Sequence, residues 1–451
     1  MKQLSYNTLR ICMIMFAVLL ISCGPGQHAG AVPQANMSDP RYQALGKSSN
    51  LSSSKWFSMR FIGNWFMDTH FLYTLGGVYN GLGDISEIMD TATRIRHTSE
   101  ISWCDEWFKT ATRVEKLADD ALAMDHKISA GEAYLRSAHY FLSAEIFLHT
   151  NVDDPRILTT YRRAGNNFVK ALRLLGVNVS VVQIPYEGMT LRGYFFRTAQ
   201  SGARPILISH QGFDAAIEST WGLAEAAIKR GWHCLLFEGP GQGLTIREHG
   251  LVFRPDWENV VAPAVDFVLR QPGVDPDNIA LMGISMGGGF AARAASYEHR
   301  LSAVVLDPGY VSISDMFTDM FPDKLLVMQE DDPADFDKKI LELAKYDFGI
   351  RWGIHHGMWV FGAKTPSQLF SILTRYEYEA DLPRITSRTL VVDAEDEEFG
   401  RGQPRRVFDL VQAPKEYMLF TRADAASLHC QTGSPAVGYA KIFDWLDENV
   451  R

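Results

Sequence analysis

A serine between two glycines is the first residue whose surroundings indicate chemistry. Residues 283–287 read Gly-Ile-Ser-Met-Gly, a Gly-x-Ser-x-Gly motif centred on Ser285. An apolar run at 278–282 precedes the motif, and small residues at 290–295 follow it, as in a strand, a sharp turn and a helix. Glycines at such a turn let the backbone fold tightly and keep side chains away from the hydroxyl. The pattern predicts that Ser285 is a nucleophile at a strand-to-helix turn.

A serine hydroxyl reacts readily only when a neighbouring base takes its proton. His429 is the best candidate for that base, because it follows the last apolar strand-like run and precedes the C-terminal helix. The base in turn needs a carboxylate that orients the ring and stabilises its charged form. We therefore expect an acid between Ser285 and His429 in the chain, which is the order found in α/β-hydrolases.

The acid should follow the apolar strand predicted at 389–392. Carboxylates are crowded there, in the sequence Asp-Ala-Glu-Asp-Glu-Glu at 393–398, and neighbouring side chains point in different directions. Only one of them can reach the imidazole, and Asp396 and Glu397 are the leading candidates. Asp307, directly after another predicted strand, is a further alternative.

The oxyanion that forms when a carbonyl is attacked requires backbone N–H donors. One donor should be the amide of Met286, the residue after the nucleophile. The second should come from the loop after the strand predicted at 205–209, where Gly212 or Phe213 would present it.

The elements that position these residues alternate between short apolar strands and helices over residues 177–451. This pattern predicts a mostly parallel sheet with helices on both faces, and catalytic groups at the carboxyl ends of its strands. Residues 55–176 have helical spacing and form a predicted helical cap domain. Residues 308–381 lack strand character and are expected to be a lid-like insertion. Its His355-His356 pair lacks partners at metal-ligand spacing, so we expect no metal.

The N-terminus is typical of a targeting segment. Basic residues precede a short apolar run that ends in Leu-Ile-Ser-Cys at Cys23, similar to the lipobox of bacterial lipoproteins. Residues 1–23 are thus a predicted signal peptide with Cys23 as the lipidated residue, and 24–54 a flexible tether. We expect an exported, membrane-anchored bacterial lipoprotein that faces the periplasm or the cell exterior.

Composition narrows the range of partners. The 451 residues carry a net charge of −9 without a long basic run, which argues against nucleic acid. The five cysteines form neither a metal-ligand pattern nor a dense disulfide framework. We expect a small-molecule carbonyl substrate and an anchoring membrane lipid as partners, a homodimer as a candidate assembly, and no cofactor.

The chain resembles the α/β-hydrolase branch of dihydropseudooxynicotine hydrolase and the fungal yellowish-green-type polyketide-shortening hydrolases. The resemblance extends from about residue 58 to the C-terminus. It rests on the motif at 283–287 and on the segments 184–188, 212–214, 237–243, 402–403 and 429–431.

The resemblance implies a Ser–His–acid hydrolase fold with the helical domain capping the nucleophile, and cleavage of a carbon–carbon bond beside a ketone. Counted back from Gly402, the acid falls on Glu397, where the branch more usually has aspartate, so Asp396 remains in competition. Glu238 also stands where aspartate is expected.

Three functions follow as hypotheses. The first is a serine hydrolase that forms an acyl-enzyme and cleaves either an ester or a carbon–carbon bond beside a ketone. The second is a serine exopeptidase, although no propeller-length repeat precedes the sheet. The third is a non-enzymatic surface lipoprotein that uses the fold to bind a ligand.

Overall fold

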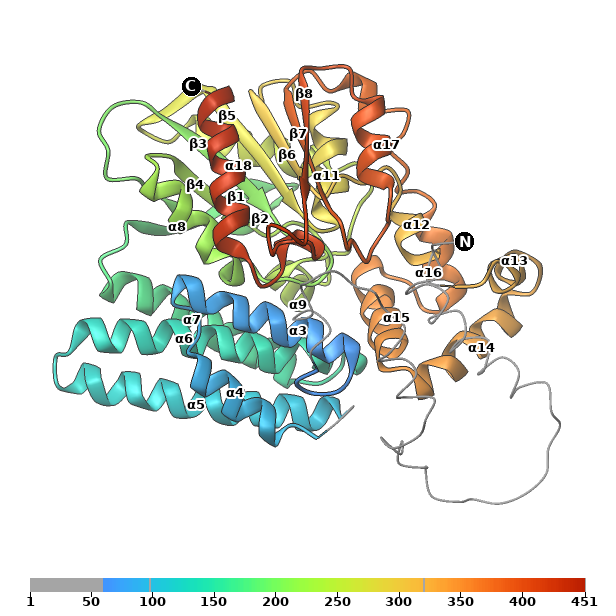
Figure 1. Ribbon diagram of the computed structural model, residues 1–451, viewed down its shortest axis with the longest axis horizontal. Coiled ribbons are helices and arrows are strands. Elements are labelled where there is room, and N and C mark those ends of the chain that lie inside the picture. The colour runs from blue at the N-terminus through green and yellow to red at the C-terminus, as the bar shows by residue number, and fades with distance from the viewer. Residues whose placement is uncertain (1–59, 97–98, 319–320, 451) are drawn as a thin grey trace.

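A single eight-stranded sheet forms the centre of the protein. The computed structural model describes residues 60–96, 99–318 and 321–450. The sheet order is β1-β2-β4-β3-β5-β6-β7-β8, with β1 and β2 antiparallel and the neighbours from β4 to β8 parallel. The predicted α/β-hydrolase fold with a mostly parallel sheet is thus confirmed (Figure 1). The strands are β1 (Val179–Tyr186), β2 (Met189–Phe196), β3 (Arg204–His210), β4 (His233–Phe237), β5 (Val274–Ile284), β6 (Ala303–Asp307), β7 (Arg388–Ala394) and β8 (Lys415–Phe420).

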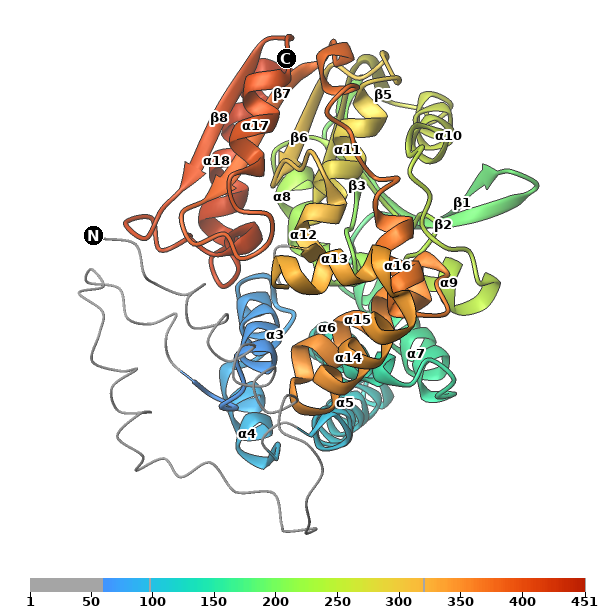
Figure 2. The same cartoon turned by 90° about the vertical axis from the view of Figure 1, so that its right-hand side faces the viewer.

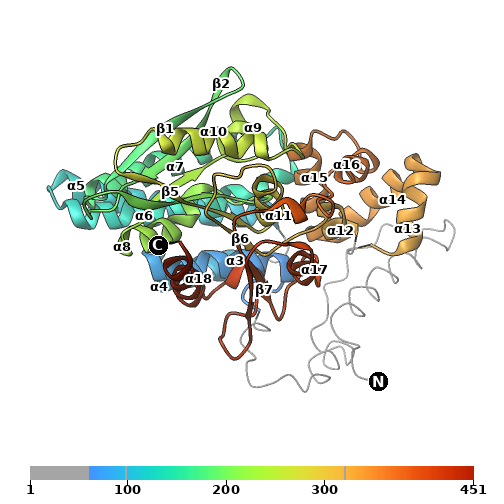
Figure 3. The ribbon, with the colours of Figure 1, turned by 90° about the horizontal axis from the view of Figure 1, so that it is seen from above.

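Helices cover both faces of the sheet. Successive side chains of each strand point in opposite directions, so each strand packs against both layers of helices. On β5, Leu281 packs into the apolar cluster of α10 (Glu258–Leu269) and α11 (Gly287–Ala295). The next residue, Met282, packs into the cluster of α8 (Trp221–Lys229) and α18 (Pro435–Asn449). Seen from above, α10 and α18 lie on opposite sides of the strands (Figure 3). Because these strands are buried on both sides, their sequences are continuous apolar runs.

Helices before the sheet form a second layer under one end of it (Figure 1). They are α3 (Trp65–Gly76), α4 (Ile85–Arg94), α5 (Glu100–Ala123), α6 (Lys127–Glu145), the short η3 (Ile146–Thr150) and α7 (Arg156–Leu174). Their facing sides bury aromatic side chains, among which Trp103 donates from its ring N–H to the Ser143 carbonyl at 2.6 Å. These helices are called the cap below.

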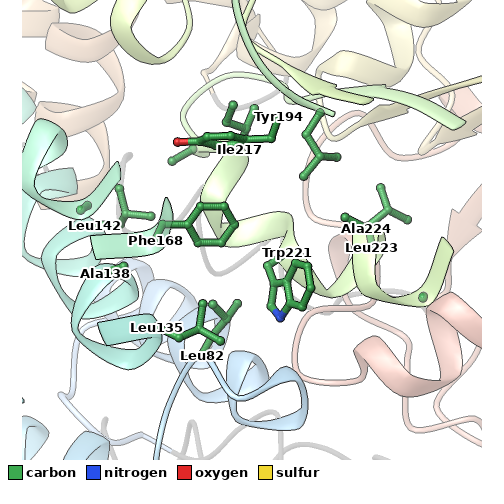
Figure 4. Packing of buried hydrophobic residues seen from close by; sticks show 14 of the residues in the cluster. Leu82, Leu135, Ala138, Leu142, Phe168, Tyr194, Ile217, Trp221, Leu223 and Ala224 are labelled. Carbon is green, nitrogen blue, oxygen red and sulfur yellow. The ribbon is translucent and has the colours of Figure 1, made fainter. Parts of the chain in front are cut away.

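The cap and the sheet share one hydrophobic core. Phe168 of α7 lies 5.2 Å from the ring of Tyr194 on β2, and Trp221 packs beside both (Figure 4). A buried polar bridge accompanies this packing. Arg192 of β2 pairs with Glu218 at 2.8 Å and also with Glu238. Glu238, where the resemblance suggested aspartate, also accepts a hydrogen bond from Tyr161 of α7 at 2.6 Å, so its longer side chain reaches the cap.

The 308–381 insertion is helical and lies against the cap (Figure 2). It contains α12 (Ile313–Thr318), α13 (Asp323–Asp331), α14 (Pro333–Tyr346), α15 (Phe348–Phe361) and α16 (Pro366–Leu373). Trp352 of α15 donates to the Ile146 carbonyl of η3 at 2.7 Å, which joins the insertion to the cap. None of the helices in the described ranges combines the length and apolar character needed to cross a bilayer. The predicted leader, Cys23 and the whole predicted tether lie outside these ranges.

Candidate active site

The turn between β5 and α11 has the geometry of a nucleophile elbow. Ser285 adopts φ 59°, a left-handed conformation that a non-glycine residue holds only at a cost of about 1–3 kcal/mol. Its amide donates to the Asp307 carbonyl of β6, which fixes the turn. A Cβ on Gly283 would lie 2.0 Å from the Gly287 oxygen, so the two motif glycines are required for the backbone to approach itself. Ser285 is therefore held in a strained, half-buried position at the end of β5, where it lines a chamber.

Two loops bring partners to this serine. His429, in the short η6 helix (His429–Gln431) after β8, places Nε2 at 2.8 Å from the Ser285 Oγ. On the other side of the ring, Nδ1 lies 2.8 and 3.0 Å from the two carboxylate oxygens of Glu397, which follows β7. Both side chains are almost completely buried. Ser285 lies 144 positions before His429 in the chain, and the structure brings both together with Glu397 in one hydrogen-bonded line.

The competing carboxylates have other partners. Asp396 bonds to the Arg422 guanidinium, with Nε at 2.8 Å, so the expectation that Asp396 might contact the histidine is wrong. Asp307 accepts from the Gln431 side chain at 3.0 Å instead of contacting the imidazole. Glu397 is further fixed by the Phe399 amide at 2.8 Å. The sequence could not separate these carboxylates because the turn after β7 decides which side chain points inward.

The environment of His429 determines its proton affinity. Burial alone disfavours the charged ring, but the neighbouring Cys430 and Glu397 outweigh it and raise the pKa of His429 well above its ordinary value. Burial also raises the pKa of the Cys430 thiol to about 11, so at pH 7 this thiol is neutral and its charge acts on the ring only at higher pH. The Glu397 carboxylate is then the group that stabilises an imidazolium as it forms.

The candidate oxyanion loop lies directly against the start of α11. A Cβ on Gly212 would be 2.6 Å from the Met286 nitrogen, so only glycine fits beside that amide. The Gly212 carbonyl accepts from the Gln242 side chain at 3.1 Å. In a trans peptide the following N–H points the opposite way, so the Phe213 amide is directed away from Gln242. The predicted donors Met286, Gly212 and Phe213 thus lie together.

His356, one of the two histidines in the insertion, also contacts this loop. Its Nε2 donates to the Phe213 carbonyl at 3.0 Å, and its ring stacks on Trp352 at 4.7 Å. Burial, followed by the charge of His149, lowers the pKa of His356 well below its ordinary value, so the ring is neutral. In the described part of the chain, no group of His, Cys, Asp or Glu side chains is arranged to hold a metal ion. His356 therefore holds the loop and packs on Trp352, whereas His355 bonds to the Arg351 carbonyl of its own helix.

The serine opens into a chamber between the cap and the sheet. Its volume is about 240 Å³, and its walls include Ser285, His429 and Gly212 on the sheet side. The cap contributes His70 and Tyr73 of α3, together with Leu142 and other apolar side chains. A reactive hydroxyl below the cap helices can act on a small molecule that is bound in this chamber.

Three polar groups of this chamber were not identified as site residues from the sequence. They are His70, Tyr73 and Asp214, and Asp214 lies next to the candidate oxyanion residue Phe213. His70 and Tyr73 are three residues apart, so they share one face of α3. For His70 and Tyr73 that spacing is the only signal in the sequence, and it is equally compatible with ordinary packing.

Comparison with known proteins agrees with this geometry. The profile of the Alpha/beta hydrolase family matches residues 206–435. Hydrolase LUC6 from Fusarium sp is 32% identical over 403 residues, covering 85% of this chain and 96% of that protein. The chain belongs to the alpha/beta hydrolase family. It is accordingly an enzyme, a hydrolase, and the hypothesis of a non-enzymatic binding protein is rejected.

Other relatives and solved structures are consistent with this assignment. The 20-hydroxy-prefusarin hydrolase FUS2 from Gibberella moniliformis is 29% identical over 402 residues, which is 85% of this chain and 96% of that protein. The crystal structure of the 2,6-dihydroxy-pseudo-oxynicotine hydrolase superposes with a TM-score of 0.67 at 21% identity, over 83% of this chain and 95% of that one. At that identity the likeness supports the fold, including the helical region before the sheet.

Proposed function

We propose that this hydrolase uses Ser285, His429 and Glu397 as a catalytic triad that forms an acyl-enzyme from a carbonyl substrate. The observation that carries the proposal is the 2.8 Å contact between the Ser285 Oγ and the His429 Nε2, with Glu397 bonded to Nδ1. Such a line lets the imidazole take the hydroxyl proton while the carboxylate stabilises the resulting positive charge.

In the first step His429 deprotonates Ser285 as the oxygen attacks the substrate carbonyl. The negative charge that develops on the carbonyl oxygen is stabilised by the amides of Met286 and of Phe213 or Gly212. The orientation of the Gly212 carbonyl toward Gln242 favours Phe213 as the second donor. Collapse of this intermediate expels the leaving group, and a water activated by His429 then hydrolyses the acyl-enzyme.

The bond that we propose is cleaved is a carbon–carbon bond beside a ketone, with esters as additional substrates. Two kinds of observation support this choice. The chamber under the cap presents more apolar than polar surface around Ser285, which suits a small organic ketone. The names of similar proteins, 20-hydroxy-prefusarin hydrolase and 2,6-dihydroxy-pseudo-oxynicotine hydrolase, refer to small organic molecules rather than peptides.

Labelling with a fluorophosphonate tests the nucleophile. The wild-type enzyme should be labelled covalently, and Ser285→Ala should not, whereas Ser312→Ala, at a buried serine that is not among the chamber residues, should be labelled normally. Equal labelling of wild type and Ser285→Ala would remove Ser285 from its role. A panel of aryl esters, β-diketones and dipeptide amides then identifies the bond, and exclusive turnover of the dipeptide amides would favour the exopeptidase.

We propose further that the enzyme is exported and anchored through Cys23. Support comes from the lipobox-like sequence alone, because this segment lies outside the described residues. Metabolic labelling with a fatty acid should modify the wild-type chain in a bacterial host and not Cys23→Ser. Labelling of both chains, or of neither, would contradict the anchor.

A further inference from the structure

Asp214 is a carboxylic acid in the reaction chamber that the triad does not use. It follows the candidate oxyanion residue Phe213 in the loop between β3 and the short η4 helix (Ile217–Thr220). The chamber that Asp214 lines also contains Ser285 and His429. About 25% of its side chain is accessible, compared with 3% of the Asp307 residue, so a molecule in the chamber can reach the Asp214 carboxyl.

The surroundings of Asp214 allow it to carry a proton. From α3, the His70 Nε2 lies 3.9 Å from the Asp214 Oδ2, and Tyr73 lines the same chamber. Burial, followed by His149, lowers the pKa of His70 to about 3, so His70 is neutral and the contact is not an ion pair. Burial raises the pKa of Asp214 to about 6, against the opposing influence of His429.

The other polar groups of the chamber are less suited to donate a proton. Arg247 is committed to Glu145, with Nε at 2.8 Å from the carboxylate. Burial raises the pKa of the Tyr73 phenol above its ordinary value, which makes it a weaker acid. Asp307 accepts a hydrogen bond from Gln431 and is almost fully covered. Asp214 is thus the accessible carboxyl beside the reacting serine.

Cleavage of a carbon–carbon bond requires an acid that protonates the leaving group, whereas cleavage of an activated ester does not. An aryl ester can expel a stable phenolate, whereas a broken carbon–carbon bond leaves an electron pair on carbon or on an enolate. Proton transfer to such a leaving group as the bond breaks contributes about 10²–10⁴-fold to the rate when the acid is placed within reach.

We propose that Asp214 is the catalytic acid that protonates the leaving carbon. The Ser285 proton passes to His429 as the oxygen bonds to the carbonyl carbon. When the tetrahedral intermediate collapses, the carbon–carbon bond breaks, and its electron pair takes the proton of the Asp214 carboxyl. The acyl group remains on Ser285 as an ester, and Asp214 is left as a carboxylate.

Water is the only further reagent needed to complete the catalytic cycle. The imidazolium of His429 returns one proton to the Asp214 carboxylate, which restores both groups. His429 then takes a proton from water as the hydroxide adds to the acyl carbon, and passes that proton to Ser285 as the acid departs. The balance is one ketone and one water converted to one carboxylic acid and one protonated carbon fragment.

The inference rests on the proposed serine mechanism, and the test separates the two. Benzoylacetone and 4-nitrophenyl acetate place the same acetyl group on Ser285, so they differ only in the leaving group. Asp214→Asn should lower kcat for acetophenone release from benzoylacetone by about 10²-fold or more. It should keep kcat for the nitrophenyl ester within about threefold, since nitrophenolate leaves without a proton. Asp307→Asn is the matched control, and any loss that it causes should affect both substrates equally.

Each outcome of this comparison either supports or overturns the role of Asp214 as the acid. Selective loss on the diketone in Asp214→Asn, with at least partial recovery in Asp214→Glu, supports the inference. Equal turnover of the diketone by Asp214→Asn and wild type, or a parallel loss on both substrates, overturns it while the serine mechanism stands. If wild type hydrolyses the ester but never the diketone, both the carbon–carbon assignment and the role of Asp214 are wrong. Fluorophosphonate labelling of Asp214→Asn verifies that the site has folded, and Asp214→Ser replaces it if it has not.

Discussion

Replacing Glu397 with glutamine tests the geometry of the triad most directly. Glu397 holds the His429 Nδ1 with both oxygens within 3.0 Å and is almost inaccessible to water, so no solvent molecule can take its place. Glutamine keeps the shape and removes the charge. It can also present its amide group to Nδ1, which would favour the wrong tautomer of the imidazole.

The expected loss follows from the charge that is removed. Two unit charges about 4 Å apart interact by about 4 kcal/mol at an effective dielectric constant of 20. This stabilisation is present when His429 becomes an imidazolium in the transition state and is absent from the neutral ground state. Since each 1.36 kcal/mol is a factor of about ten in rate, Glu397→Gln should lower kcat by about 10³-fold, and by about 10⁴-fold if the tautomer also changes.

The assay is steady-state hydrolysis of a 4-nitrophenyl ester, with a thermal melt to verify the fold. Asp396→Asn is the matched control, because Asp396 pairs with Arg422 at a partly exposed position and such pairs contribute about 1 kcal/mol or less. Its kcat should stay within about threefold of wild type. The reasoning is refuted if Glu397→Gln retains more than about a tenth of the activity while Asp396→Asn loses most of it.

The remaining predictions concern the base and the oxyanion loop. The active form of His429 is the neutral ring, and the protein raises the pKa of this ring. We therefore expect kcat/KM for an ester to increase with pH above 6.5 and to level off only above the pKa of His429 in the folded protein. A profile that is already flat at pH 6.5 would contradict the raised pKa. Gly212→Ala places a Cβ 2.6 Å from the Met286 nitrogen, and kcat should fall by about 10²-fold or more, with wild-type activity in the variant as the opposing result. His356→Phe keeps a ring for stacking but removes the donor to the Phe213 carbonyl, so kcat for a nitrophenyl ester should fall about tenfold with KM nearly unchanged; an unchanged kcat would show that the loop does not depend on this bond.

Local patterns in the sequence were sufficient to predict the fold and to single out Ser285 and His429, which the structure places in contact. Short continuous apolar runs that alternate with helical segments predict a sheet covered on both faces, because a strand that is apolar on both sides must be buried between two layers. The glycines around Ser285 predict the strained turn, since a Cβ on Gly283 would lie only 2.0 Å from the Gly287 carbonyl oxygen. His429 could be identified from its position after the last strand, because carboxyl ends of parallel strands meet at one edge.

Only the tertiary structure decided which carboxylate contacts the histidine and what surrounds the serine. Asp396 and Glu397 are adjacent in sequence, and the direction of a turn, not the residue type, sends one to Arg422 and the other to His429. The chamber walls come from cap helices, the loop after β3 and the segment after β8, which are distant in the chain, so no local pattern could place Asp214 in one chamber with Ser285. Proton affinities depend in the same way on burial and on neighbours brought close by folding, and these are properties of the packed molecule rather than of any segment.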